Sequence, residues 1–204
     1  MAKAQTVVIS YEDGSRAVEL ARDAVESYVL NGSRERPGCM RDAFYQRTGV
    51  LVRLESTRGR GQLRGCAGYV DGDDQLGHAI VDAAIDAASE GSCGSEVGPS
   101  ELSNLRVSVC IICDRFESSD PASDLELGVH GAAIEGDGRR EWLYPSVPVE
   151  NGWSVEEYLG RTCRKLKLPP MAWENGDADV TLFEGRMFRE REPEGVVEQL
   201  SPGE

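Results

Sequence analysis

The chain has 204 residues, of which 40% are apolar, and its formal net charge is −14. That length supports one substantial domain, and the apolar content excludes a disordered chain. Only three of the 22 basic residues are lysine, and an acidic excess keeps a surface hydrated in concentrated salt, so we expect a halophilic protein. In molar salt, ion pairs are screened within about 3 Å, so charge must be argued locally.

The sequence contains neither a run of about 18 apolar residues nor, in residues 1–10, the pattern of a signal peptide. We therefore expect a cytoplasmic protein without a membrane segment. Six cysteines are scattered through a chain that is long enough to build its own core. Reduced thiols are the expectation, rather than a disulfide framework.

In the first half of the chain, apolar spacing predicts an amphipathic helix over residues 15–31, with Gly32 as its stop. Strand-like segments follow at 49–55 and 63–70, joined by a loop rich in glycine and arginine. Residues 76–88 repeat alanine and aliphatic side chains at helical spacing, which is the clearest helical pattern in the chain.

In the second half, residues 90–103 resemble a loop and residues 105–113 a strand. Segments 129–135 and 141–144 flank Gly136-Asp137-Gly138 and predict a hairpin. Ser154 and Glu157 form a capping box for a further helix. The last predicted strand covers 180–188, and a frayed end is expected from Glu190 on.

Strands joined by hairpins or long connections, with helices interspersed, predict an α+β fold with a mainly antiparallel sheet and flanking helices. We expect the domain to span residues 15–190. An N-terminal extension (1–14) and a flexible acidic tail (191–204) would lie outside it.

The segment 63–69, Leu-Arg-Gly-Cys-Ala-Gly-Tyr, sets Cys66 between Gly65 and Gly68 and two residues after Arg64. Glycine lets a backbone approach a ligand closely. A nearby arginine or protonated histidine lowers the pKa of a thiol, so Cys66 is a candidate nucleophile. The alternative is a small buried side chain in a strand, because free cysteine is among the most buried residue types.

The two histidines differ in their predicted surroundings. His78 lies away from the apolar stripe of its helix and is expected to pair with Asp82. His130 follows Gly128-Val129 and precedes Gly131 at the start of a predicted strand, which makes it the better candidate base for Cys66. A hydrogen-bonded turn histidine is the alternative for His130.

Residues 34–64 hold eight arginines and three acids, so this segment carries +5 within an acidic chain. Such an island can focus an anionic partner. Arg58, Arg60 and Arg64 are the candidate contacts for a phosphate, since arginine offers a forked set of donors. The alternative for this loop is a solvated hairpin.

Other motifs predict less chemistry. Cys110-Ile-Ile-Cys113 has the spacing of redox and zinc motifs, but in a strand residues three apart point to opposite faces, so we expect core packing and no metal. Phosphate-loop and dinucleotide fingerprints are absent, and no cofactor is expected. Four aromatic side chains have two alternative roles: Trp142, Tyr144, Trp153 and Trp173. They line a groove, in which Tyr144 and Trp153 would contact a ligand, or they pack in the core.

The order of these motifs resembles the AMMECR family, named for the Alport syndrome, mental retardation, midface hypoplasia and elliptocytosis chromosomal region. The resemblance spans about residues 15–190, and Leu-Arg-Gly-Cys followed by a small residue and glycine at 63–68 is its most specific element. The other matching pieces are Glu19-Leu-Ala-Arg-Asp-Ala-Val25, Gly49-Val-Leu-Val, Gly128-Val-His-Gly131, Tyr144-Pro-Ser-Val-Pro148, Gly152-Trp153 and Thr162-Cys-Arg-Lys165 before Trp173.

The resemblance implies an α+β domain of two lobes with a cleft between them. The family has no assigned reaction; roles linked to RNA modification are implied, with Memo-like or radical SAM proteins as partners. This chain departs from the family at residues 89–94, where a helix usually leads into Asp-Pro-Arg-Phe, and at Ser146, where glutamine or glutamate is usual.

Three functions are consistent with the sequence. The first is a binding or accessory module that takes a nucleotide or RNA around Arg64, Cys66 and His130. The second is an enzyme with Cys66 as nucleophile, His130 as base and Arg64 as anion contact. In the third, the chain is a protein scaffold and Cys66 is structural.

Overall fold

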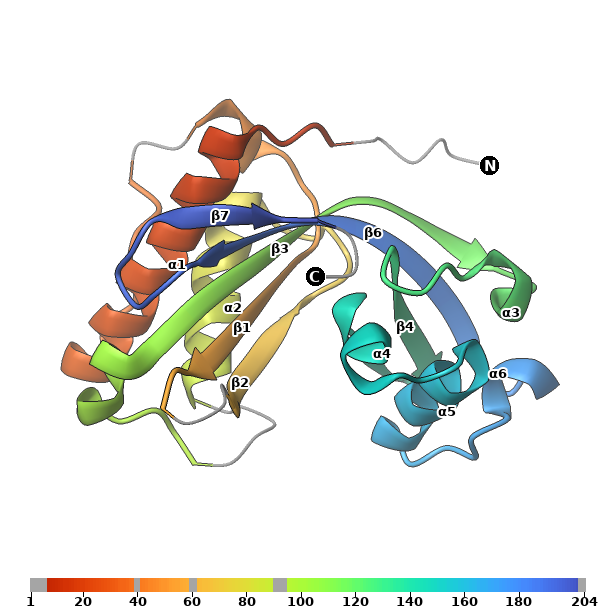
Figure 1. The fold of residues 1–204 in the computed structure, drawn as a ribbon. Coiled ribbons are helices and arrows are strands. Elements are labelled where there is room, and N and C mark those ends of the chain that lie inside the picture. Colours follow the sequence, from red (N-terminus) through yellow and green to blue (C-terminus); the bar gives the residue numbers. More distant parts are fainter. Residues whose placement is uncertain (1–6, 39–40, 59–61, 90–94, 202–204) are drawn as a thin grey trace. The chain divides into compact units, whose positions relative to one another are not determined.

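The computed structural model describes residues 7–38, 41–58, 62–89 and 95–201 (Figure 1). The chain divides into two compact units. The larger unit comprises Val7–Ile112 and Arg186–Leu200, and the described part of the smaller unit comprises Cys113–Gly185 and Ser201. Each unit holds part of one sheet, because β3 and β6 contribute residues to both, and each unit is described separately.

The larger unit is an antiparallel sheet with two long helices. β1 pairs with β2 on one side and with β3 on the other, in the order β2-β1-β3-β6, and β7 pairs with β6. Its elements are α1 (Tyr11–Asn31), the 3-10 helix η1 (Asp42–Tyr45), β1 (Val50–Ser56), β2 (Gln62–Tyr69), α2 (Leu76–Ser89), the 3-10 helix η2 (Pro99–Asn104), the first part of β3 (Leu105–Ser118), the end of β6 (Asp179–Glu190) and β7 (Val197–Leu200).

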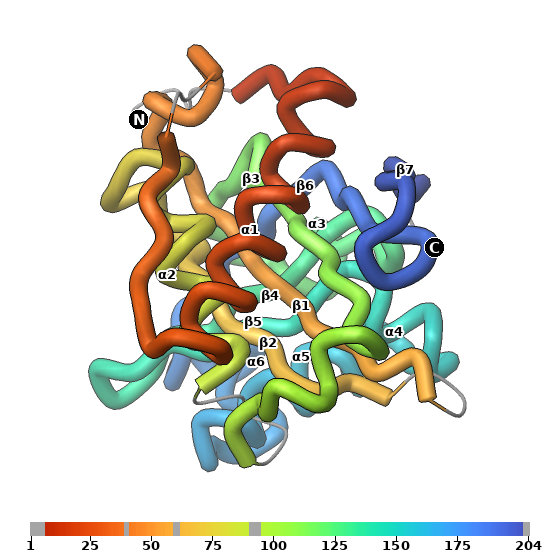
Figure 2. The backbone as a smooth tube through the Cα atoms, turned by 90° about the vertical axis from the view of Figure 1, so that its left-hand side faces the viewer, coloured from red at the N-terminus to blue at the C-terminus, as the bar shows by residue number. Residues whose placement is uncertain are grey.

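The two long helices, α1 and α2, lie on the same face of this sheet. Figure 2 views the molecule from that face, with α1 in front. The predicted apolar stripes are buried on α1 and on α2, where Leu76, Ile80 and Ala84 are fully enclosed. α2 packs on β1 and β2, and α1 packs beside α2. The sheet therefore has one face covered by helices, and the alternation of its strands decides which side chains lie on the other face.

The first helix begins earlier than the sequence pattern indicates. Ser10 caps α1: its hydroxyl accepts from the amide of Asp13, and the Asp13 carboxylate accepts from the amide of Ser10 at 3.0 Å. Val7 and Ile9, in the expected N-terminal extension, are buried. The prediction overlooked this capping box because the apolar stripe that was counted starts only at Ala17.

The expected frayed tail is also different in the structure. Residues of β7 pair with β6 in register from Met187↔Leu200 to Glu190↔Val197. Val197 and Leu200 are buried there, and the hydroxyl of Tyr11 donates to the Val197 carbonyl at 2.6 Å. The charged residues and the proline of the preceding turn led to the prediction of a frayed end, although a strand of four residues follows them.

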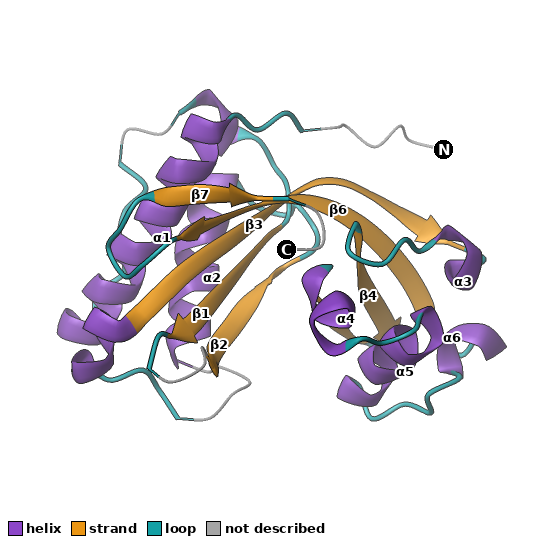
Figure 3. Cartoon of the chain, in the orientation of Figure 1, coloured by secondary structure: helices purple, strands orange, loops and turns teal. Residues whose placement is uncertain are grey.

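The smaller unit contains the antiparallel order β6-β4-β5 with short helices beside it (Figure 3). The ring of Tyr158 anchors its core, since the hydroxyl accepts from the amide of Ala132 and donates to the Leu143 carbonyl at 2.7 Å. Its elements are the end of β3, α3 (Pro121–Asp124), β4 (His130–Gly136), β5 (Arg139–Leu143), α4 (Ser146–Asn151), α5 (Val155–Lys165), α6 (Ala172–Asn175) and the first part of β6.

The structure confirms the predicted α+β fold with a mainly antiparallel sheet and flanking helices. The predicted helices and strands are present, the hairpin around Asp137 and the capping box of Ser154 included. In the described part of the chain, no helix is both long and apolar enough to cross a bilayer. The cleft implied by the family resemblance stays a prediction.

A buried ion pair joins α1 to the sheet of the larger unit. Arg22 donates from Nε and Nη2 to Glu190 at 3.0 and 2.5 Å, and its guanidinium also donates to the carbonyls of Leu102 and Leu105. Glu190 in addition accepts from the amide of Val107 at 2.9 Å. The two charged side chains are 8% and 4% exposed, so neither would be hydrated if its partner were lost.

Replacing Arg22 with methionine should therefore lower the free energy of unfolding by about 3–5 kcal/mol, because it leaves the carboxylate of Glu190 buried with only one amide. Urea unfolding measures this change. The double variant Arg22→Met/Glu190→Met should recover part of the loss, while Arg16→Met, which breaks an exposed pair with Glu19, should change stability by less than about 1 kcal/mol. A loss below about 1 kcal/mol for Arg22→Met would contradict the assignment.

Candidate functional site

Cys66 lies in β2 on the sheet face opposite α2. Its neighbour Gly65 faces α2, because a Cβ atom there would lie 2.0 Å from the carbonyl oxygen of Ala87. Across the strands, Cys66 pairs in register with Arg53 of β1, and Arg53 pairs with Ser108 of β3. A thiol, a guanidinium and a hydroxyl therefore form one row across three strands.

The next row of the same face holds a shared ion pair. Glu55, which is 8% exposed, receives Arg53 Nη2 at 2.8 Å on one carboxylate oxygen and Arg106 Nη2 at 2.6 Å on the other. Glu55 is thus shared by two guanidiniums that come from neighbouring strands. Sequence reasoning missed Arg53, Arg106 and Ser108 as site residues, although the alternation of β1 and β3 and their pairing would have placed them beside Cys66.

Arg64 was predicted to contact an anionic ligand. In the structure its guanidinium instead donates to groups of the same chain. Its guanidinium binds both carboxylate oxygens of Glu101, at 2.6 and 3.0 Å. It also donates to the carbonyls of Ser95 and Glu96 at 2.6 and 2.8 Å. The hydrogen bond from Arg64 lowers the pKa of Glu101, and the charge of Arg58 acts in the same direction. Arg64 thus fastens β2 to the segment that leads into η2.

Much of the arginine-rich segment is neutralised by acids from elsewhere in the chain. Arg34 donates to Asp82 at 2.8 and 3.0 Å, so Asp82, the predicted partner of His78, serves an arginine instead. Arg41 binds Asp13, and Arg47 donates to a backbone carbonyl. Arg58 is exposed, and Arg60 lies outside the described residues. The predicted +5 is consequently not a free surface charge.

The predicted ligand glycines are explained by packing. Gly65 sits against the backbone of α2, as its contact with Ala87 shows. At Gly68, a Cβ atom would lie 2.3 Å from the carbonyl oxygen of Val50 and 2.6 Å from the Cα atom of Leu51. Both glycines therefore allow β2 to approach neighbouring backbone, and a ligand is not needed to account for them.

His130 lies in β4 of the smaller unit, while Cys66 belongs to the larger unit, so their pairing stays a prediction. The Nδ1 atom of His130 accepts from the amide of Glu126 at 2.9 Å, which leaves the proton of the neutral ring on Nε2. Nε2 lies 3.2 Å from the Glu184 carboxylate, and the ring meets Phe116 edge to face. Both ring nitrogens are thus engaged within the smaller unit, as expected for a turn histidine.

The two aromatic candidates belong to the packing of the smaller unit. Tyr144 is 3% exposed and meets Trp142 edge to face at 5.4 Å. Trp153 is half-buried against the core, with the guanidinium carbon of Arg161 4.2 Å from its ring centroid. Tyr144 is therefore a core residue, as the second interpretation predicted. Trp153 packs one side of its ring on the core and leaves the rest of its surface partly exposed.

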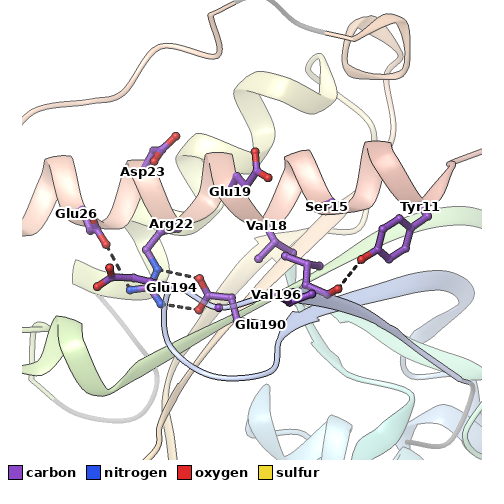
Figure 4. Close-up of a pocket in the computed structure, with 12 residues that line it drawn as sticks. Tyr11, Ser15, Val18, Glu19, Arg22, Asp23, Glu26, Glu190, Glu194 and Val196 are labelled. Carbon is purple, nitrogen blue, oxygen red and sulfur yellow. Dashed lines mark hydrogen bonds and ion pairs between the residues drawn. The ribbon is translucent and has the colours of Figure 1, made fainter.

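A depression of about 470 Å³ lies beside α1 in the larger unit (Figure 4). Arg22 and Glu190 form its polar wall, and Glu26 lies 3.6 Å from Arg22. Burial raises the pKa of Glu26, and the charges of Glu194 and Asp23 add to the effect. The carboxylates that line it outnumber the single guanidinium, so this depression repels an anion.

The chain is therefore an α+β protein in which helices cover one face of an antiparallel sheet and a polar row with Cys66 lies on the other. The AMMECR1 family model matches residues 18–188, and the chain belongs to this family. The crystal structure of an uncharacterised protein from Pyrococcus horikoshii superposes with a TM-score of 0.87 at 31% identity, covering 94% of this chain and 98% of that one.

Two relatives extend the match over nearly the whole sequence. A Halobacterium salinarum protein is 59% identical, covering 98% of this chain and all of the relative. A Methanosarcina acetivorans protein is 37% identical over 93% of this chain and 98% of its own length.

Replacing Gly65 with alanine should lower the free energy of unfolding by about 1–3 kcal/mol, because the new methyl group meets the backbone of α2. Gly98→Ala is the matched control, since a Cβ atom there makes only an ordinary contact at 3.7 Å with Glu101. Urea unfolding compares the two variants. If Gly65→Ala keeps full stability, the glycine has a role other than packing.

Glu101 and Glu26 should change the pH dependence of stability in opposite directions. Arg64 lowers the pKa of Glu101, so its stabilisation is present above the ordinary pKa of about 4.5 and is lost as the pH falls through the lowered value. Burial raises the pKa of Glu26, so this group costs stability at pH 7 and the cost disappears as the pH falls through the raised value.

We therefore expect Glu101→Gln to lower the melting temperature at pH 7 and to weaken the loss of stability in acid. Glu26→Gln should raise the melting temperature at pH 7, with a gain that shrinks towards acid pH. Thermal melts of both variants between pH 7 and pH 3 measure these slopes. If the melting temperature of the two variants depended on pH in the same way, the pKa shifts described for Glu101 and Glu26 would be contradicted.

Proposed function

We propose that the chain is a binding module for a phosphate-bearing ligand, a nucleotide or an RNA segment, held on the sheet face that carries Cys66, Arg53 and Arg106. The observation that supports this proposal most is the sharing of one carboxylate, Glu55, by two guanidiniums. Guanidiniums on a largely enclosed face act on an anion with less screening than guanidiniums at the surface.

The chemistry of the neighbouring residues fits a phosphate. Ser108 adds a hydroxyl donor in the row of Cys66 and Arg53, and arginine forks match phosphate oxygens. Arg58, exposed near Glu101, and Arg60 remain candidates for contacting the rest of a longer ligand. Memo-like or radical SAM proteins remain the proposed partners in an accessory role.

A cysteine-dependent enzyme is the second candidate, favoured by the position of Cys66 directly across from Arg53. A neighbouring guanidinium stabilises a thiolate. Catalysis would also need a base, and His130 has both ring nitrogens engaged with Glu126 and Glu184. Binding therefore accounts for more of the observed contacts than turnover does.

The variant Arg53→Gln/Glu55→Gln/Arg106→Gln replaces both guanidiniums together with the carboxylate that they share. We expect it to weaken binding of ATP or of an oligouridylate about tenfold, and to reduce the slope of log K against log salt by about 1. Fluorescence anisotropy over a salt series measures both quantities. Arg53→Gln/Glu55→Gln, which leaves the net charge unchanged, should keep the wild-type slope.

Arg16→Gln/Glu19→Gln on α1 is the remote control and should bind as wild type does. An unchanged affinity and slope in the folded triple variant would refute the site. So would the absence of any rise in the wild-type melting temperature with either ligand, because a ligand that binds the native state stabilises it. Selective alkylation of Cys66 at pH 7, unaffected by both ligands, would favour the enzyme instead.

A further inference from the structure

A second carboxylate in the sheet of the larger unit is shared by two arginines, as Glu55 is. Glu198 of β7 accepts from Arg189 Nη2 at 2.7 Å on one carboxylate oxygen and from Arg191 Nε at 2.9 Å on the other. The hydrogen bond from Arg189, together with that from Arg191, lowers the pKa of Glu198. Two guanidiniums therefore hold one ionised carboxylate at the end of β6 as well.

The alternation of β6 shows which face of the sheet carries this second cluster. Phe188 and Glu190 face the helices. A Cβ atom at Gly14 of α1 would lie 2.3 Å from the ring of Phe188, and Glu190 binds Arg22 of the same helix (Figure 4). The residue between them must point to the face that is free of helices.

That residue is Arg189, and Glu198 pairs with it in register, so both lie on the same face. Arg53 and Arg106 belong to this face too, because they lie in the rows of the sheet that face away from α2. The two clusters, one around Glu55 and one around Glu198, are therefore on one face of the sheet.

The two clusters are also neighbours within the sheet. The strands follow in the order β1-β3-β6, and β7 pairs with β6. The amide of Val107 in β3 donates to Glu190 at 2.9 Å, so the end of β6 lies beside the residue that follows Arg106. Since strands are spaced about 4.8 Å apart, β1 and β7 are separated by about 14 Å. Four arginines line this distance and are called the arginine band: Arg53, Arg106, Arg189 and Arg191.

The arginines of the second cluster keep donors for a ligand. A guanidinium carries five N–H donors. Among the described residues, Arg191 donates to Glu198 from Nε alone, and its side chain is exposed, so both its Nη atoms remain available. Arg189 donates to Glu198 from Nη2 and is half-buried, as Arg53 and Arg106 are.

The length of the arginine band narrows the ligand of the site proposed above. The phosphates of a mononucleotide lie together at one end of the molecule, so they meet one cluster at a time. The linked phosphates of a polynucleotide reach both. A flexible single strand can follow half-buried guanidiniums, whereas a rigid duplex holds its backbones apart. No aromatic side chain lies on this face in the described strands of the larger unit, so the contacts are with the backbone and not with the bases.

We propose that the ligand of this face is a single-stranded polynucleotide whose backbone crosses β1, β3, β6 and β7 and places phosphates on both clusters. This inference rests on the phosphate site proposed around Glu55, and adds the cluster of Glu198 to it.

The test measures affinity against ligand length by fluorescence anisotropy, with the full chain in a salt series in which circular dichroism shows it folded. The ligands are labelled UMP, ATP, and oligouridylates of two to twelve nucleotides. We expect dodecauridylate to bind at least about tenfold more tightly than UMP or ATP. Its slope of log K against log salt should be steeper, by about 0.7 for each additional phosphate contact. Dodecaadenylate should bind equally well, and a duplex of the same length at least about tenfold more weakly.

Arg189→Gln/Arg191→Gln/Glu198→Gln removes the second cluster. It should weaken the binding of dodecauridylate about tenfold and lower its salt slope by about 1, and it should change the affinity for ATP by less than about twofold. Arg191→Gln alone removes an exposed side chain beyond the end of β6 and should weaken dodecauridylate about threefold, which keeps the test open if the triple variant does not fold.

Arg34→Gln/Arg36→Gln/Asp82→Asn is the matched control. It also replaces two arginines and one carboxylate, but around the exposed pair of Arg34 with Asp82 on α2. It should bind dodecauridylate as the wild type does.

Three results would overturn the inference: affinity that does not rise from ATP to dodecauridylate, wild-type binding of dodecauridylate by the folded triple variant, or equal weakening by the matched control. Each of them leaves ATP binding, and with it the phosphate site around Glu55, intact. If neither ATP nor any oligonucleotide binds, the proposed function itself fails.

Discussion

The larger unit depends on one buried contact, the pair of Arg22 with Glu190. The pair joins α1 to β6, and through Leu105 and Val107 both side chains also hold the start of β3. β3 pairs in register with β1, and β1 with β2, so this contact fixes the start of the strand that carries Ser108 in the row of Arg53 and Cys66. Any displacement of α1 against this sheet that separated the two charges would leave both of them buried and unpaired, which is costly.

The arginine-rich segment shows how a charge pattern along a sequence differs from a charge in space. Residues 34–64 have an excess of arginine, but Arg34, Arg41 and Arg64 are paired with acids that lie far away in the sequence or beyond the segment. Such partners cannot be found by counting neighbours. Within the segment, Arg53 shares the buried Glu55 with Arg106 of the adjacent strand β3, and both guanidiniums are half-buried there.

Most of the fold could be predicted from the sequence because α2, β1 and β3 have apolar patterns that match their periods. Apolar periodicity did not predict two short features that have no long apolar pattern: the capping box of Ser10 and the four-residue strand β7. The candidate site was predictable only in part. Cys66 was identified, but its true neighbours depend on the bulge between Leu54 and Glu55, which shifts the register of β2.

The residues around Cys66 are better explained by their packing, which places β2 in the sheet, than by a reactive loop. Gly65 and Gly68 bring β2 close to α2 and β1, and Arg64 fixes the strand to the segment before η2. These three residues thereby set the thiol on the polar side of the sheet, in register with Arg53 and Ser108. The anion site proposed above uses this row, whose groups are held by the pairing of three strands before a ligand binds.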